Sequence, residues 1–157
     1  MLGQGPDFAE IRKARAGDWP GVLALLREHG LPIDGAREQL AGFLVAEVDG
    51  WIVGCAGLEQ YGEVGLLRSV AVSADAGRHG VGSTLVRQVL REARMRRVGE
   101  VYLLTTTAAD WFPRFGFSVT TRGELPAVLE SSEELRRACP GTAVAMRLSL
   151  APEGGPR

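Results

Sequence analysis

Two two-residue turns divide residues 43–72 into three strand-like runs. The runs FLVAEV and WIVGCAGLEQY flank Asp49-Gly50, which is the strongest short-range signal for a β-hairpin. Gly62-Glu63 makes a second tight turn before VGLLRSVAV, residues 64–72. Connections this short can join only antiparallel neighbours, because parallel strands need a crossover of a dozen or more residues. The sequence therefore predicts an antiparallel meander of three strands.

Helical and strand-like segments alternate on both sides of this meander. Before it come a strand over 8–14, a helix from Asp18 to Gly30 and a weaker helix over 36–40. After it, the expected elements are a helix over 82–96, a strand over 101–106, a short helix over 108–115, a strand over 117–121, a helix over 125–138 and a strand over 142–150. This order predicts an α/β fold: a mixed, mostly antiparallel sheet with helices on both faces.

Size and composition limit the domain count and the class of partner. The 157 residues suffice for one domain, expected over residues 8–150, with flexible Gly- and Pro-rich tails over 1–7 and 151–157. The net charge of −1 argues against a nucleic-acid binder. The start lacks a signal-peptide pattern and no apolar run reaches about 18 residues, so we expect a cytoplasmic protein without a membrane segment. Two cysteines and two histidines predict no metal site.

A glycine-rich loop follows the third strand of the meander and opens the next helix. Glycines let the backbone approach a ligand closely, and the first turn of a helix presents unpaired N–H groups and a positive dipole end. Together they form a cradle for an anion such as a pyrophosphate. The spacings of the Walker and dinucleotide motifs are absent, and a plain connecting loop is the alternative. The candidate ligands are Gly77, Arg78, His79, Gly80, Val81, Gly82 and Ser83.

The segment VAVSADAGRHGVGSTLV resembles the acetyl-CoA signature of the GNAT N-acetyltransferases, in which V-A-V precedes R/Q-x-x-G-x-G/A and a helix. WFPRFGF, residues 111–117, resembles the second signature of that family, and the element order matches its fold over residues 8–150. Gly77 stands where the family has arginine or glutamine, and the arginine follows at Arg78. The resemblance implies a GNAT-fold enzyme that uses acetyl-CoA as cosubstrate. Since backbone amides do most of the phosphate binding in that family, we expect cofactor binding to survive this departure.

A narrower resemblance concerns the acceptor. The runs LLRSVAV, LLTTTAADWFPRFGF, ELPAVL and ACPGTAVAMRL resemble the small N-acetyltransferases of arsenic-resistance gene clusters and, more distantly, the acetyltransferase domain of N-acetylglutamate synthases. Both imply a small amino-acid-like amine as acceptor, with an arsenic-containing amino acid as one candidate. The alternatives are glutamate N-acetylation in arginine biosynthesis and a non-catalytic acyl-CoA-binding regulatory module. Related folds often form homodimers, which the C-terminal strand could support here.

The resemblance also implies direct transfer within a ternary complex. The backbone of Val70, Ala71 and Val72 would pair with the pantetheine arm, and an N–H near Val70 would stabilise the oxyanion of the thioester carbonyl. The threonines at 105–107 could offer hydroxyls to the pantetheine or the acceptor.

The usual proton-handling residues of the family are absent. Its tyrosine aligns with Phe112 and its central-strand glutamate with Leu66. Pairing across the second turn of the meander places Glu59 opposite Leu66, with Arg68 on the same face of the sheet. We hypothesise that Glu59 accepts the amine proton while Arg68 holds the carboxylate of the acceptor. The alternative is a structural ion pair between these two residues.

Overall fold

The computed structural model describes residues 9–138 and 141–150, so the tails expected at 1–7 and 151–157 lie outside the described residues. Its sheet has seven strands in the order β1-β2-β3-β4-β5-β7-β6. The strands are β1 (Glu10–Lys13), β2 (Phe43–Val48), β3 (Trp51–Tyr61), β4 (Val64–Val72), β5 (Glu100–Thr105), β6 (Ser118–Thr120) and β7 (Val144–Ser149). The helices are α1 (Trp19–Glu28), α2 (Ala74–Gly77) and α3 (Val81–Met95). Short 3-10 turns cover Ala16–Asp18, Leu40–Gly42, Phe112–Phe115, Arg122–Glu124 and Ala127–Ser131, and a π-helical turn covers Glu134–Ala138.

The meander forms as predicted. Strands β2, β3 and β4 have the predicted boundaries and pair antiparallel, with Tyr61 opposite Val64 and Glu59 opposite Leu66. Asp49 and Gly50 both have positive φ, which a two-residue hairpin turn needs to match the twist of its strands. These local turn requirements explain why the register could be read from the sequence.

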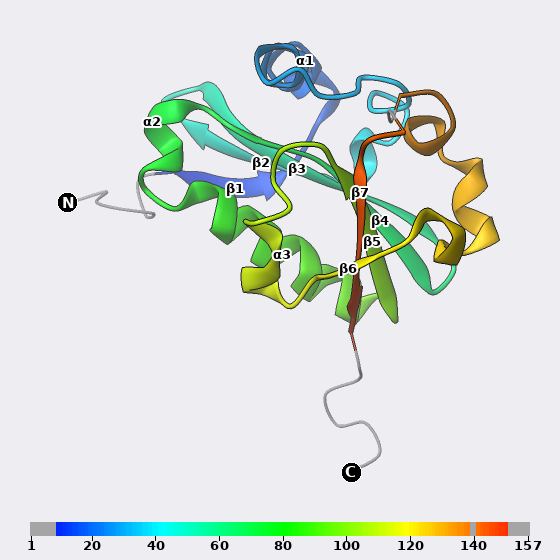
Figure 1. Cartoon of the computed structure of the whole chain (residues 1–157). Helices are drawn as coiled ribbons and strands as arrows, with labels where there is room; N and C mark the ends of the chain where they lie inside the picture. Colours follow the sequence, from blue (N-terminus) through cyan, green and yellow to red (C-terminus); the bar gives the residue numbers. More distant parts are fainter. Residues whose placement is uncertain (1–8, 139–140, 151–157) are drawn as a thin grey trace.

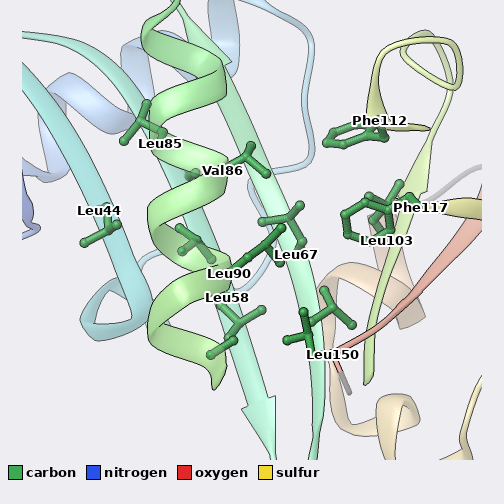
Figure 2. Packing of buried hydrophobic residues seen from close by; sticks show 14 of the residues in the cluster. Leu44, Leu58, Leu67, Leu85, Val86, Leu90, Leu103, Phe112, Phe117 and Leu150 are labelled. Carbon is green, nitrogen blue, oxygen red and sulfur yellow. The ribbon is translucent and has the colours of Figure 1, made fainter. Parts of the chain in front are cut away.

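Helices cover both faces of the sheet, and each face has its own apolar cluster. In Figure 1, α1 lies above the sheet and α3 below it. The apolar side chains of α3 recur along one side of the helix and pack on Leu58 and Leu67 of the sheet (Figure 2). On the opposite face, Val22 and Leu26 of α1 pack with Val45 of β2. Alternation along β2 sends Leu44 to the first cluster and Val45 to the second, so the middle of the sheet is buried on both faces.

Strands β4 and β5 separate soon after they pair. Their parallel ladder has three pairs, which end at Leu66 opposite Tyr102. Beyond that point β4 continues from Leu67 to Val72 and β5 from Leu103 to Thr105 without pairing to each other. The opening between these two halves of the sheet positions the site described below.

Strand β7 is an inner strand of the described sheet, and a homodimer supported by the C-terminal strand stays a prediction. It pairs with β5 along one side and with β6 along the other, so Arg147 lies opposite both Tyr102 and Ser118. Because both sides of β7 carry ladder partners over residues 145–147, its backbone groups there have no free edge for a second chain. In the described sheet the edge strands are β1 and β6.

Three expected helices are wrong in extent. Residues 36–39 form turns instead of a helix, and the helix expected over 108–115 is reduced to a 3-10 turn at Phe112–Phe115. The helix expected over 125–138 is divided at Ser132, whose backbone is extended and whose hydroxyl accepts a hydrogen bond from Leu135 N at 3.3 Å. Serine side chains that bond the local backbone compete with continuous helix, and short helices carry a nucleation cost. The expected loop at 73–80 contains the short helix α2.

Candidate active site

A cleft of about 990 Å³ opens between the diverging halves of β4 and β5. Its walls come from segments that are far apart in the sequence. They are the loop after α1 at 29–34, the end of β4 at 67–72, the glycine-rich segment at 77–83, the end of β5 with the loop that follows at 103–108, and single residues that include Trp111, Phe112, Arg114 and Glu134. Cavities of this size accommodate small molecules and cofactors.

The glycine-rich segment forms one end of the cleft. Gly80 precedes α3 with a φ of +75°, a left-handed conformation in which a side chain would be strained. The first backbone hydrogen bond of α3 runs from Thr84 N to Gly80 O at 3.1 Å. The amides of Val81, Gly82 and Ser83 therefore precede the intrahelical ladder and carry the positive end of the dipole of this 15-residue helix. The helix start has the geometry that the predicted anion cradle requires, and anion binding by these residues stays a prediction.

The predicted cradle residues have different positions. Five of the seven line the cleft: Gly77, Arg78, Gly80, Gly82 and Ser83. Val81 is 1 % exposed in the α3 cluster, so only its backbone can face a ligand, and His79 is not among the lining residues. A Cβ atom at Gly82 would lie 3.3 Å from Val72 Cγ2 and 3.5 Å from Trp111 Cζ2. Glycine at this position therefore allows α3 to begin close to the end of β4.

A bulge shapes β4 beside the glycine-rich segment. Between the pairs Gly57–Arg68 and Cys55–Ala71, β4 has one residue more than β3, and Ser69 has a φ of +59°. Such a bulge redirects the strand and its backbone groups. Val70 and Val72 line the cleft, whereas Ala71 is buried in the α1 cluster. Beyond Leu66 the β5 side of β4 has no ladder partner, so a ligand can pair with it there.

The predicted pair Glu59 and Arg68 is in contact and buried. Arg68 Nη1 donates to Glu59 Oε2 at 2.8 Å, and the two side chains are 0 % and 1 % exposed. The other carboxylate oxygen, Glu59 Oε1, accepts from the Tyr61 hydroxyl at 2.6 Å. Burial, followed by this hydrogen bond, raises the pKa of Tyr61 above its usual value. Both oxygens of Glu59 are thus occupied within the protein, and Glu59 is not among the residues that line the cleft.

Arg68 also connects β4 to the loop after α1. Its Nη1 donates to the carbonyl of Asp34 at 2.8 Å, its Nη2 to the carbonyl of Pro32 at 3.2 Å, and its Nε to Ser69 Oγ at 2.9 Å. A guanidinium has five N–H donors, so four are engaged, counting the bond to Glu59. This geometry matches the structural ion pair that the sequence left as the alternative.

Glu134 is a cleft residue that the sequence reasoning missed. It begins the π-helical turn, is 4 % exposed and lines the cleft, with Oε2 at 3.7 Å from Arg68 Nε. Burial raises the pKa of Glu134 to about 7, with Arg68 opposing the rise and Glu59 adding to it. In the sequence it lies in the run SSEELRR, which is typical of a solvated helix face and carries no signal of burial.

The remaining candidates contribute walls more than reactive groups. Phe112, at the position of the family tyrosine, is 6 % exposed and stacks edge-on against Trp111. The threonines at 105–107 line the cleft as expected, and Thr105 Oγ1 accepts from Ala108 N at 2.9 Å. Cys55 is buried, and burial raises the pKa of its thiol to about 12, which argues against a nucleophile.

In the described part of the chain, no group of three or more His, Cys, Asp or Glu side chains could hold a metal ion. Within residues 9–138 and 141–150, none of the helices has the length and apolarity needed to cross a bilayer.

Comparisons with known proteins agree with this geometry. The family model "Acetyltransferase (GNAT) domain" matches residues 39–119. The amino-acid acetyltransferase of Neisseria meningitidis (strain Z2491) is 34% identical over 128 residues, which cover 76% of this chain and 29% of that protein. An amino-acid acetyltransferase of Actinobacillus pleuropneumoniae (strain JL03) is 34% identical over 125 residues, covering 74% and 29%. The chain thus spans about 29% of the length of these curated relatives.

Solved structures of other proteins share this fold. N-acetylglutamate synthase from Neisseria gonorrhoeae, complexed with coenzyme A and N-acetyl-glutamate, superposes with a TM-score of 0.78 at 26% identity, covering 91% of this chain and 35% of that one. Rv2747 from Mycobacterium tuberculosis, in complex with CoA and NLQ, superposes with a TM-score of 0.75 at 25% identity, covering 90% and 99%.

Proposed function

The chain belongs to the GNAT family of acetyltransferases, and from this premise we propose that it transfers the acetyl group of acetyl-CoA to the amine of an amino acid. The observation that carries the proposal is the cleft between β4 and β5, with an anion cradle at the start of α3 and an unpaired strand edge beside it. A diphosphate and an amide-bearing pantetheine arm need these two features side by side.

The chemistry follows from the positions of the backbone groups. The cradle amides would hold the diphosphate, and the backbone of Val70 to Val72 would pair with the pantetheine arm along the free edge of β4. An N–H near Val70, redirected by the bulge at Ser69, would stabilise the oxyanion that develops on the thioester carbonyl. Holding the two substrates in one cleft lowers the entropic cost of the reaction.

A glutamate-like acceptor has more support than an arsenic-containing one. The curated relatives are named amino-acid acetyltransferases, and the Neisseria gonorrhoeae enzyme was solved with N-acetyl-glutamate. Since the chain covers only part of those proteins, the acceptor itself is part of this proposal. The arsenic-containing acceptor stays a prediction that no comparison tests. The roles suggested for Glu59 as proton acceptor and Arg68 as carboxylate ligand also stay predictions.

The proposal is tested by binding and turnover. We expect calorimetry to detect coenzyme A uptake, and thiol release from acetyl-CoA to increase in the presence of one or more amino acids from a panel that includes glutamate. A regulatory module that only binds acyl-CoA would show the first result without the second. Absence of coenzyme A uptake would contradict both functions.

A matched pair of variants locates the cofactor. Ser83 lines the cleft within the cradle and is half-buried. Ser83→Glu places a carboxylate where the diphosphate should bind, and Ser83→Gln adds a side chain of similar size without charge. We expect Ser83→Glu to bind coenzyme A at least about tenfold more weakly than Ser83→Gln, because like charges close together repel. Equal affinities would place the diphosphate elsewhere.

A further inference from the structure

The part of the cleft around Arg68 and Glu134, called the inner end from here on, holds a buried carboxylate that has no role in the proposed function so far. Glu134 lines the cleft and is 4 % exposed, and its carboxylate is in ion-pair contact with Arg68. Arg68 is held in place by Glu59 on β3 and by the carbonyls of Pro32 and Asp34. Glu134 therefore contacts an arginine that is itself fixed by β3 and by the loop after α1.

The other groups near this end are poorly suited to take a proton from a substrate. Glu59 has both carboxylate oxygens engaged by Tyr61 and Arg68 and does not line the cleft. Leu66 and Phe112 have no acid–base function. Among the described lining residues, Asp34 is the other carboxylate, and it lies exposed in the loop after α1.

We propose that Glu134 is the general base that accepts a proton from the ammonium group of the acceptor, an inference that rests on the proposed acetyl transfer. The carboxylate takes one ammonium proton, directly or through one water, and leaves a neutral amine. The amine nitrogen then forms a bond to the thioester carbonyl carbon, and the carbon–sulfur bond breaks. The thiolate of coenzyme A leaves and receives the second nitrogen proton, and Glu134 returns the first proton to solvent.

The surroundings of Glu134 suit this role. Its pKa of about 7 reflects burial, the attraction of Arg68 on β4 and the repulsion of Glu59 on β3. The other titratable residues on the loop wall of the same cleft are His29 and Asp34. A base with a pKa near the working pH combines a large ionised fraction with sufficient proton affinity. This assignment replaces the earlier hypothesis for Glu59 as proton acceptor and Arg68 as carboxylate ligand: both are then positioning residues, which act on the reaction through Glu134.

The decisive experiment is the pH dependence of kcat/KM for an acceptor amino acid found by the panel above. We expect the wild-type profile to bend near pH 7, with kcat/KM decreasing as the pH falls below that value. In Glu134→Gln the bend should disappear, and kcat/KM at pH 8 should fall by at least about 100-fold, the lower end of what a positioned base contributes. Glu133→Gln is the matched control, because this neighbouring carboxylate pairs with Arg136 and has a 43% exposed side chain. It should keep the wild-type bend.

A second variant keeps the test open if Glu134→Gln fails to fold. Glu59→Gln removes the negative charge that raises the pKa of Glu134, so the bend should move to lower pH. A bend that stays in place in Glu59→Gln, or a Glu134→Gln profile that superposes on the wild type, would overturn the assignment. Coenzyme A binding separates this failure from a failure of the proposed function. If the wild-type chain shows neither coenzyme A uptake nor turnover, the proposed acetyl transfer and the role of Glu134 are both wrong. If uptake and turnover are normal but the Glu134→Gln profile is unchanged, only the role of Glu134 is wrong.

Discussion

The two ends of the cleft are built in opposite ways. One end, called the phosphate end because the proposed function places the diphosphate there, comes from one continuous segment, residues 77–83. Its positive character comes from backbone amides and the dipole of α3. The inner end combines the loop after α1, strands β3 and β4 and the π-helical turn, and its character comes from buried charged side chains. A site made of backbone amides depends little on which side chains surround it. The cradle can therefore keep its form although Gly77 stands at the position where the family has arginine or glutamine and the arginine follows at Arg78. The inner end should be sensitive to single substitutions.

Removal of Arg68 should give the largest effect at the inner end. Arg68→Met leaves the Glu59 carboxylate buried without its partner and should lower the free energy of unfolding by about 3–5 kcal/mol. Urea denaturation measures this loss. The double variant Glu59→Leu/Arg68→Met removes both charges and should recover a large part of it, because no unpaired charge then remains in that pair. A loss below about 1 kcal/mol in the single variant, the range of exposed ion pairs, would contradict the tight coupling of this end.

The pH dependence of stability should give the next largest effect. The pKa of Glu134 rises from 4.5 to about 7 on folding, so the folded state binds this proton more tightly than the unfolded state. The stability associated with the proton is complete below pH 4.5 and is lost as the pH rises through 7. Relative to the wild type, Glu134→Gln should therefore gain up to about 3 kcal/mol between pH 4.5 and pH 7.5. Denaturation at both pH values measures the gain, and a constant difference would show that Glu134 does not change its pKa on folding.

The smallest effect should come from the phosphate end. Gly80→Ala places a side chain at a φ of +75° and should cost about 1 kcal/mol of stability. Gly77→Ala is the matched control, because Gly77 ends α2 without positive φ and a Cβ atom there meets nothing within 4 Å. Thermal unfolding of both variants measures the difference. Equal costs would mean that the left-handed turn is not what requires glycine in the cradle.

The elements that could be predicted from the sequence share a local cause. Asp49-Gly50 and Gly62-Glu63 are the connections of the meander, and the register of β3 on β4 follows from the second of them. The start of α3 at Val81 depends likewise on the left-handed conformation of the preceding Gly80. The segment at 125–138 has a helical pattern, but the helix is interrupted at Ser132, whose hydroxyl accepts a hydrogen bond from the local backbone. Hydrophobic periodicity does not reveal such a hydrogen bond, so the interruption could not be predicted from it.

The candidate site likewise has one part that could be predicted from the sequence and one part that could not. By itself the sequence determined the meander and the helix start after the glycine-rich loop, because each depends on turn chemistry, periodicity or a helix start within one short segment. The GNAT fold was indicated by the resemblance of two short segments to the family's signatures. Only the tertiary structure decided that Arg68 is engaged by the loop after α1 and that Glu134 is buried in the cleft. Burial and pKa depend on which distant segments surround a side chain, and those neighbours are established only when the chain has folded.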